Sequence, residues 1–297
     1  MTRRGWLLFA VMCVLWGISY LFIKVAVDEV SVPFLVFLRT GGGALVLLPL
    51  VARTGLSRAV SDIRTHWRWI VAFSAAEMIG PWFLLSSAEQ RIDSGLAGLL
   101  IAGVPIVGIF VGRAIGDRER LGAVRWAGLL LGLLGVFALA APALRGGDWL
   151  AMGEMALVVV GYALAPRLAA RHLTTVPGLT LSAASLTIAG VVYLPWAIAT
   201  WPHRQPSAAA WASLGALAIV CTATAFVAFF GLIAEVGPSR AMVFTYVNPA
   251  VAVVAGMLLL HEPFTAAMAV AFPLIIAGSV LATRTAKVAA PAPAPVG

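Results

Sequence analysis

Apolar stretches of about 20 residues, the length that crosses a bilayer as a helix, follow one another along almost the whole chain. Short polar or glycine-containing segments separate them, among them Asp28-Glu29, the segment from Arg53 to Arg64, and Arg145-Gly146-Gly147-Asp148. The first stretch is too long for a signal-peptide core, so we expect it to be retained. The pattern predicts an all-α integral membrane protein with ten transmembrane helices, over residues 6–26, 33–52, 67–87, 94–112, 123–142, 149–169, 177–199, 209–233, 239–260 and 265–283.

The predicted helices form two similar halves. Landmarks that recur at a nearly constant offset are Ala97 and Ala241, Pro105 and Pro249, Glu119 and Glu262, and Gly135 and Gly278. Five helices per half is an odd number, so the second half starts on the opposite side of the membrane from the first. We therefore predict two inverted five-helix repeats, residues 1–142 and 143–287, followed by a disordered tail of alternating Ala and Pro over residues 288–297.

Composition and charge support a membrane environment and suggest an orientation. Hydrophobic residues make up 62% of the chain and charged residues 11%, whereas soluble domains carry about 25% charged residues. If both termini are cytoplasmic, the outer loops keep only Lys24, Arg91, Arg145 and Arg204, and most of the 20 Lys and Arg residues fall inside. This excess follows the positive-inside rule. It predicts a multi-pass protein of the inner (cytoplasmic) membrane with both termini in the cytoplasm. Because the basic residues are scattered at helix ends, we expect no nucleic-acid partner.

Charged residues within the predicted spans are candidates for a functional site. Glu77 lies near the middle of the third span, where a charge costs roughly 2.5–3.5 kcal/mol on insertion scales and normally faces the bundle interior. It could bind a substrate ammonium group, carry a coupling proton, or hydrogen-bond a neighbouring helix. Arg39 lies about two turns into the second span. It could pair with Glu77, bind a substrate carboxylate, or snorkel to the interface, which is also the favoured interpretation of Lys24.

Aromatic and polar residues at mid-depth form a second group of candidates. Trp16 and Tyr20 share one helix face, with Ser19 beside it. An indole N–H or phenol hydroxyl needs a partner at that depth, so this face suggests a cavity wall, with tight interhelical packing as the alternative. The complete set of candidate substrate-binding residues is Trp16, Ser19, Tyr20, Arg39, Glu77, Trp82, Tyr162, Tyr246 and Asn248.

Two prolines occupy matching positions in the fourth and ninth spans, Pro105 and Pro249. A proline inside a helix removes one backbone hydrogen bond. Paired interruptions in corresponding helices are the best sequence pointer to a transporter's binding site. We predict that both prolines are hinge points, although an ordinary transmembrane proline kink is the alternative.

Several short motifs carry a resemblance to a known family. They are Leu15-Trp16-Gly17-Ile18-Ser19-Tyr20, Pro33 through Arg39, Ala97-Gly98-Leu99-Leu100 leading to Pro105, Glu119-Arg120-Leu121, Tyr246-Val247-Asn248-Pro249, His261-Glu262-Pro263, and Gly278. Over about residues 6 to 285 the chain resembles the EamA-domain transporters of the drug/metabolite transporter superfamily. The resemblance implies export of amino acids, other small metabolites or drugs, through a cavity lined by helices 1, 3, 4, 6, 8 and 9. The sixth helix departs from the family pattern, which leads us to expect a tryptophan near Tyr162.

The leading hypothesis is a secondary transporter that exports a small metabolite, such as an amino acid or an amphipathic organic cation, by alternating access around a central cavity. The alternatives are an intramembrane enzyme or a passive channel that uses Glu77 and Arg39. The sequence contains no phosphate-cradling glycine loop, nucleophile elbow or metal-ligand motif. We therefore expect no catalytic residue, no metal and no cofactor. The expected partners are a small-molecule substrate, membrane lipid and protons as the coupling ion, and the sequence leaves the oligomeric state open.

Overall fold

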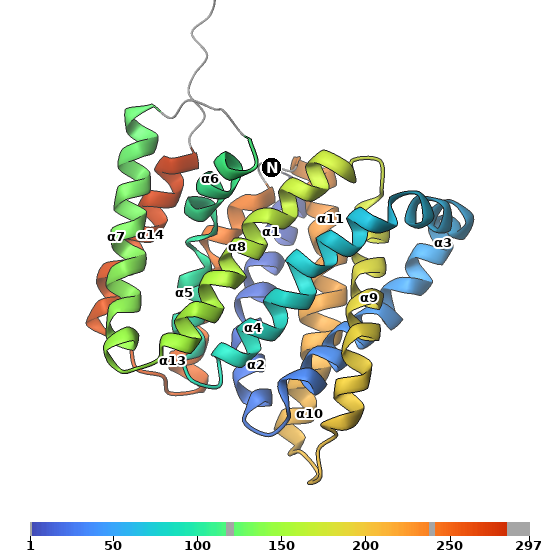
Figure 1. The fold of residues 1–297 in the computed structure, drawn as a ribbon, viewed down its shortest axis with the longest axis horizontal. Helices are drawn as coiled ribbons and strands as arrows, with labels where there is room; N and C mark the ends of the chain where they lie inside the picture. The colour runs from blue at the N-terminus through green and yellow to red at the C-terminus, as the bar shows by residue number, and fades with distance from the viewer. Residues whose placement is uncertain (1, 117–121, 238–240, 284–297) are drawn as a thin grey trace, which may run out of the picture.

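The structure, a computed structural model, describes residues 2–116, 122–237 and 241–283, and every regular element in these ranges is a helix (Figure 1). The predicted tail over residues 288–297 and the Glu119-Arg120-Leu121 motif lie outside the described residues. The helices are α1 (Arg3–Gly17), α2 (Ser19–Val27), α3 (Val32–Ser74), η1 (Ala75–Ile79), α4 (Gly80–Ala88), α5 (Ser94–Ile101), α6 (Val104–Ala114), α7 (Ala123–Arg145), α8 (Trp149–His172), α9 (Gly178–Ala199), α10 (Ala208–Gly215), η2 (Ala216–Thr224), α11 (Ala225–Val236), η3 (Met242–Tyr246), α13 (Asn248–Leu259) and α14 (Ala266–Thr283).

Six helical stretches are long and apolar enough to cross a membrane, and a bent pair, α5 with α6, would make a seventh. The six stretches are Arg3–Val27, Val32–Ala88, Ala123–Arg145, Trp149–His172, Gly178–Ala199 and Ala208–Val236. The apolar helices Asn248–Leu259 and α14 are shorter. The described residues thus form an all-helical membrane protein.

The segment from Arg53 to Arg64, which the sequence pattern predicts to be a break, is helical. It continues α3 from the second predicted span into the third, and only Gly55 has non-helical angles, with φ 133°. Glycine tolerates positive φ because it has no Cβ atom. Two helices therefore meet at a kink at Gly55 within α3.

Other predicted spans are interrupted near their middle. α1 gives way to α2 at Ile18, and η1 and η2 are π-helical segments that precede α4 and α11. Between α5 and α6 the axis bends by 44°. A 3-10 helix, η3, precedes α13. Short π-helical segments inside α-helices occur frequently at functional sites, so these interruptions direct attention to the centre of the bundle.

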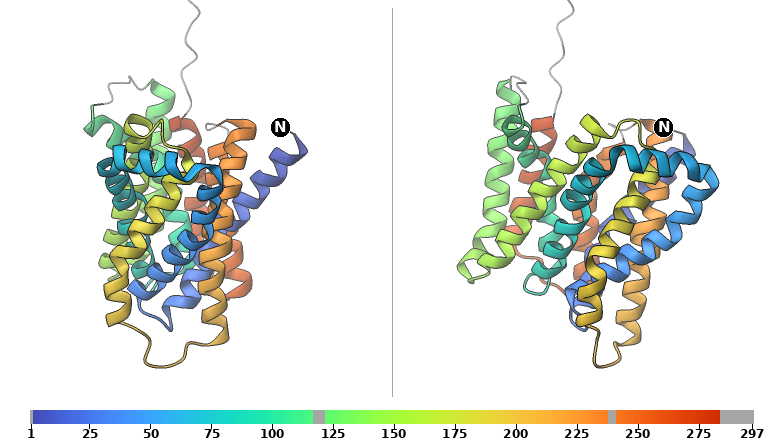
Figure 2. Two further views of the ribbon diagram at one scale, coloured as in Figure 1. Left: turned by 90° about the vertical axis from the view of Figure 1, so that its right-hand side faces the viewer. Right: turned by 45° about the vertical axis from the view of Figure 1, so that its right-hand side comes forward.

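Helices far apart in sequence pack in pairs. α3 packs along α9, α5 against α13, and α7 along α14, while α4 packs against α8 and α1 against α11. The α7–α14 pair stands at one side of the bundle, and the N-terminus lies at the end opposite the α9–α10 connection (Figure 2). We call the end that holds the α9–α10 and α4–α5 connections the α4–α5 end.

Small residues allow α7 and α14 to approach closely. A Cβ atom added to Gly278 of α14 would lie 2.4 Å from the backbone nitrogen of Gly132. One added to Gly128 would lie 2.5 Å from the backbone nitrogen of Ala282. Glycines at such contacts are typical of membrane helix interfaces, because they bring two backbones together.

Candidate functional site

Arg39 occupies the centre of the bundle, on α3. Arg39 is only 5% exposed. Its Nε–H donates to the Oγ1 atom of Thr222 at 3.2 Å, and its guanidinium carbon lies 3.8 Å from the centroid of the Trp82 ring. A buried charge needs such partners, and stacking of a desolvated cation on an indole contributes about 2 kcal/mol. Arg39 is therefore held from α4 in the first half of the chain and from η2 in the second.

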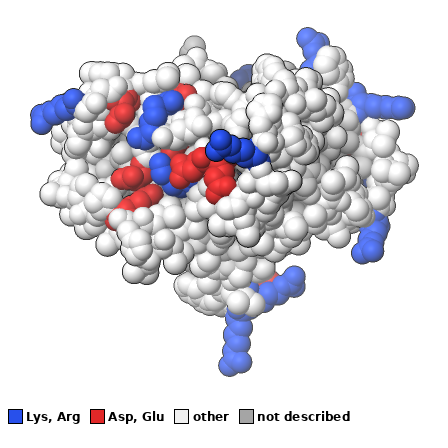
Figure 3. Space-filling model, turned by 90° about the horizontal axis from the view of Figure 1, so that it is seen from below, with Lys and Arg blue, Asp and Glu red and all other residues white. Residues whose placement is uncertain are grey.

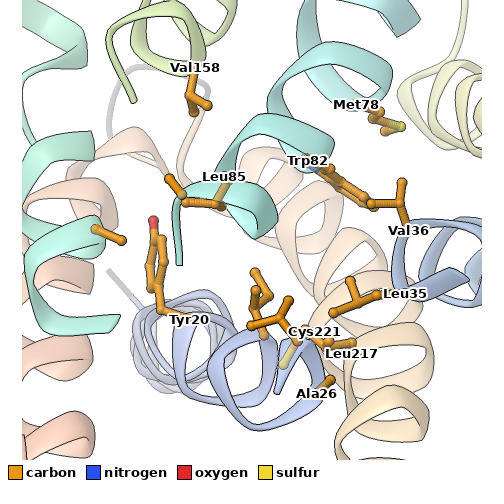
Figure 4. Packing of buried hydrophobic residues seen from close by; sticks show 14 of the residues in the cluster. Tyr20, Ala26, Leu35, Val36, Met78, Trp82, Leu85, Val158, Leu217 and Cys221 are labelled. Carbon is orange, nitrogen blue, oxygen red and sulfur yellow. The ribbon is translucent and has the colours of Figure 1, made fainter. Parts of the chain in front are cut away.

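Two tyrosines complete the surroundings of Arg39. Tyr20 of α2 and Tyr162 of α8 both interact electrostatically with its guanidinium. The Trp82 side chain also lies close to the Tyr162 side chain. We call Tyr20, Arg39, Trp82, Tyr162 and Thr222 the central polar cluster. Figure 4 shows Trp82 reaching from α4 toward Val36 of α3, with Tyr20 standing on α2 close to Leu85.

Glu77 lies next to this cluster, in the π-helical segment η1. It is half-buried and interacts electrostatically with Tyr162. The ion pair found among the described residues joins Arg91 and Glu154. Glu77 and Arg39 therefore do not form the ion pair that the sequence offers as one alternative. No hydrogen bond to Glu77 occurs within the described ranges either. The carboxyl group thus stays available for another partner.

The helix that carries Tyr162 packs tightly against the segment that carries Glu77. A Cβ atom at Gly161 would lie 2.5 Å from the backbone oxygen of Ala76 and 2.8 Å from Cγ of Pro81. Only a residue without a side chain permits this approach. Gly161 therefore brings the phenol of Tyr162 into range of Glu77.

Trp16 and Ser19 lie in a different environment from the central polar cluster. The Trp16 ring packs against Phe226, Phe229 and Phe244, with ring centroids 5.1–5.9 Å away. The hydroxyl of Ser19 donates to the backbone oxygen of Trp16 at 2.8 Å. The structure thus places Trp16 in an aromatic contact between α1, α11 and η3, which corresponds to the packing alternative for this helix face.

Asn248 and Pro249 begin α13, immediately after the 3-10 helix that contains Tyr246. With its amide in the orientation that satisfies both neighbours, Asn248 donates to the backbone oxygens of Cys13 and Phe244, at 3.3 and 3.1 Å. Asn248 therefore ties α1 to η3. Tyr246 is half-buried, and Pro105 is the second residue of α6, directly after the 44° bend. Each predicted hinge proline lies where a second helical piece begins.

Comparison with known proteins identifies the family. Two stretches of the chain, residues 3–141 and 149–284, match the EamA-like transporter family. The chain belongs to the EamA-like transporter family. The resemblance seen in the sequence motifs is thereby confirmed, and the chain is a membrane transporter.

Relatives of this EamA-like transporter cover nearly its whole length. YedA of Escherichia coli strain K12, described as an uncharacterized inner membrane transporter, is 26% identical over 91% of this chain and 87% of its own length. YvbV of Bacillus subtilis strain 168, described as an uncharacterized transporter, is 25% identical over 96% of this chain and 93% of its own. A solved crystal structure that is 22% identical matches with a TM-score of 0.66 over 95% of this chain and 98% of that chain. This last likeness shows the fold alone.

Acidic and basic side chains gather at the α4–α5 end of the transporter, which is the face seen in Figure 3. Arg91 pairs with Glu154 of α8, whose other oxygen accepts from Ser87 at 2.8 Å. Both carboxylate oxygens of Glu262 accept from backbone N–H groups that begin α5, those of Ser94 at 2.8 Å and Gly95 at 2.9 Å. A carboxylate is favoured at a helix N-terminus, where unpaired N–H groups point outward. These contacts join the two halves of the chain at this end.

Two loop carboxyl groups at this end have shifted pKa values. The hydroxyl and the backbone N–H of Ser207, both donating to Glu29, hold the pKa of the Glu29 carboxyl below its ordinary value. Partial burial raises the pKa of Asp93, and the nearby charge of Glu262 acts in the same direction.

The sequence pattern does not predict the contacts of Lys24 and Thr222 or the burial of Glu89. Lys24 donates to the backbone oxygens of Glu89 and Ile92, at 2.7 and 3.2 Å, so it binds the end of α4 and does not snorkel. Thr222 is one of many threonines and serines in apolar stretches, and the neighbouring sequence does not distinguish it as a partner of Arg39. The charge of Glu89, beside a predicted loop, suggests exposure, yet the residue is fully buried.

Proposed function

We propose that this EamA-like transporter is a secondary exporter of a small metabolite with an ammonium group and an apolar portion, such as an amino acid or an amphipathic organic cation. The observation that carries the proposal is the half-buried Glu77 carboxyl, which has no hydrogen-bond or ion-pair partner among the described residues and lies within electrostatic range of Tyr162. A carboxylate beside aromatic rings recognises an ammonium group through charge and cation–π contact.

Arg39 supplies a complementary group. A guanidinium has five N–H donors, and its Nε–H is bound to Thr222. The terminal nitrogens can bind a solute carboxylate as a fork, a geometry that arginine favours. A zwitterionic amino acid would place its ammonium group at Glu77 and its carboxylate at Arg39, with its side chain against the tyrosines and Trp82.

We propose ten membrane-spanning segments. The helical run Val32–Ala88 contains 57 residues, which at 1.5 Å per residue is far longer than one crossing needs, and the turn at Gly55 divides it. The bent α5–α6 pair would form one span, and η3 with α13 another. With α14, these segments complete ten.

The helix contacts support an inverted repeat. The proposed repeat relates each span to the span five places along the chain. Under this exchange the contacts α3–α9, α5–α13 and α7–α14 each map onto themselves, and the contact α1–α11 maps onto α4–α8. The π-helical segments η1 and η2 correspond, as do the breaks before Pro105 and Pro249. The family also matches the chain twice, on residues 3–141 and 149–284. Such repeats support alternating access, because each half can adopt the other's conformation.

We assign the α4–α5 end to the outside of the cell. Lys24, Arg91, Arg145 and Arg204 lie at or near this end, whereas Arg3, Arg4, Arg58, Arg64 and Arg171 lie near the opposite one. The positive-inside rule then places the N-terminus in the cytoplasm. The inner membrane location of the relative YedA, as its description gives it, supports the same membrane here. Membrane lipid and protons remain the proposed partners besides the solute.

Flux through purified protein tests the proposal. The full chain is reconstituted into liposomes without ATP, and uptake of labelled phenylalanine, alanine and choline is measured with and without a pH gradient. We expect saturable uptake of at least one cationic or zwitterionic solute, inhibited by the others according to their apolar area. Inhibition by anionic metabolites alone would overturn the role of Glu77, and unsaturable flux would indicate a channel.

A further inference from the structure

Glu89 is a buried carboxyl group that the proposed transport site does not use. It follows the last residue of α4 and is 0% exposed. Neither carboxylate oxygen has a hydrogen-bond partner within the described part of the chain. Leaving an ionised carboxylate buried without partners is among the most costly arrangements in a protein. The arrangement is explained if the carboxyl group is neutral.

The nearest cation does not neutralise this carboxyl group by a direct bond. The Lys24 ammonium donates instead to the backbone oxygen of Glu89 itself, at 2.7 Å, and to that of Ile92, at 3.2 Å. It thereby satisfies carbonyl groups at the end of α4, which have no partner inside the helix. An ionised Glu89 would compete for this ammonium, because a full negative charge attracts a cation more strongly than a carbonyl dipole does.

The other charged groups around Glu89 are few. Arg39 of α3 and Glu262, from the α13–α14 connection, interact with it electrostatically, as does Tyr20 of α2. On α8, the Glu154 carboxylate is already bound by Arg91 and Ser87. Glu262 repels a second negative charge, and so does the negative end of the α4 dipole, at which Glu89 sits.

One neighbour is suited to a protonated carboxyl group. Ser86 lies one turn before Glu89 on the same face of α4. It is fully buried, and its hydroxyl also lacks a partner within the described ranges. A hydroxyl oxygen can accept a bond from a carboxylic acid, and its hydrogen can be donated in return. Only the protonated form of Glu89 can both donate a hydrogen bond to this hydroxyl and accept one from it.

We propose that Glu89 is a proton-binding site that controls closure of the α4–α5 end. When this end closes, a proton from the adjoining solution forms an O–H bond with the Glu89 carboxylate, and the neutral group is buried. When the end opens, the proton returns to that solution, and the exposed carboxylate draws Lys24 away from the α4 carbonyl groups. The inference rests on the proposed alternating access. Acid pH therefore favours the closed α4–α5 end.

The second half of the chain contains a counterpart. Glu235 follows Ala234 near the end of α11, as Glu89 follows Ala88 at the end of α4. α11 and α4 are exchanged by the proposed repeat. Glu235 is half-buried and accepts a bond from the hydroxyl of Thr2, at the opposite end of the molecule. The two carboxyl groups thus occupy different environments, as expected if only one end is closed.

Difference infrared spectroscopy of the purified full chain in lipid tests the protonation of Glu89 directly. We expect a protonated-carboxyl band at neutral pH that is present in the wild type, Glu77→Gln and Glu89→Asp, and that loses intensity in Glu89→Gln. A wild type without the band, or a Glu89→Gln variant with a band of wild-type intensity, would overturn the inference. If Glu89→Gln fails to fold, the test still stands. The wild type and Glu89→Asp both retain a carboxyl group at this position, so their bands can be followed against pH without that variant.

Spin labels at Gln90→Cys and Arg204→Cys test the coupling to closure, since both native cysteines are buried. We expect the label distance in the wild type to lengthen as pH rises, and to stay short at every pH in Glu89→Gln, which mimics the neutral acid. The matched control Asp28→Asn, at an exposed position, should follow the wild type. A pH-independent wild-type distance would overturn the proposal. Neither measurement requires a transported solute, so both can succeed if the proposed substrate class is wrong.

Discussion

The Arg39 guanidinium lies 3.8 Å from the centroid of the Trp82 ring, and this stack joins the second and third proposed spans at the centre of the bundle. Both residues are nearly inaccessible. The bond from Arg39 to Thr222 extends the contact to the second half of the chain. The central polar cluster is thus assembled from segments of both halves of the chain.

The stack predicts coupled effects of substitution at Arg39 and Trp82. In a double-mutant cycle of Arg39→Met and Trp82→Leu, measured by unfolding in detergent, we expect a coupling free energy of about 1–2 kcal/mol, because each substitution removes one side of a desolvated cation–π contact. Strictly additive effects would show that the contact contributes nothing to stability.

The close approach of α7 and α14 predicts that Gly278→Ala is destabilising. The added Cβ atom would meet backbone atoms of Gly132 at 2.4–2.5 Å, so one helix has to shift, at a cost of about 1–3 kcal/mol. Gly153→Ala on α8 is the matched control, because its Cβ atom would meet nothing within 4 Å. The unfolding midpoint should fall for the first variant only, and equal midpoints would contradict the packing.

The Glu262 carboxylate predicts a local weakening when it is removed. Glu262→Ala leaves the N–H groups of Ser94 and Gly95 without their acceptors, and we expect a loss of about 1–2 kcal/mol, as for other helix N-terminal acceptors. Amide hydrogen exchange at the start of α5 should accelerate in Glu262→Ala and stay unchanged in Asp28→Ala. Unchanged exchange at α5 in the first variant would exclude this capping role.

The sequence was sufficient to predict an all-helical membrane protein, because the length of an apolar stretch is a local property. Arg39, Trp82, Tyr20, Tyr162 and Glu77 are brought near one another, as expected of residues at a shared membrane depth. The sequence could not predict that the break between the second and third spans is confined to a kink at Gly55, since the charges of residues 53–64 are typical of both an exposed loop and an interfacial helix.

The sequence also does not predict which groups the buried polar side chains contact. Whether Asn248 lines a cavity or bonds the backbone of Cys13 depends on how α1 meets η3. The burial of Glu89 depends in the same way on how Lys24 and Ser86 are placed around the end of α4. Such contacts join residues distant in sequence, and no local pattern encodes them.

The most direct test of the account is solute uptake by Glu77 variants in liposomes. Labelled phenylalanine uptake is compared for the wild type, Glu77→Gln, Glu77→Asp and the exposed control Asp28→Asn. A charge-assisted hydrogen bond contributes about 1.5–3 kcal/mol, and about 1.4 kcal/mol corresponds to a factor of ten. We therefore predict at least a tenfold loss of uptake in Glu77→Gln, partial retention in Glu77→Asp, and wild-type uptake in the control. Wild-type uptake by Glu77→Gln at every pH would contradict the central role of this carboxyl group.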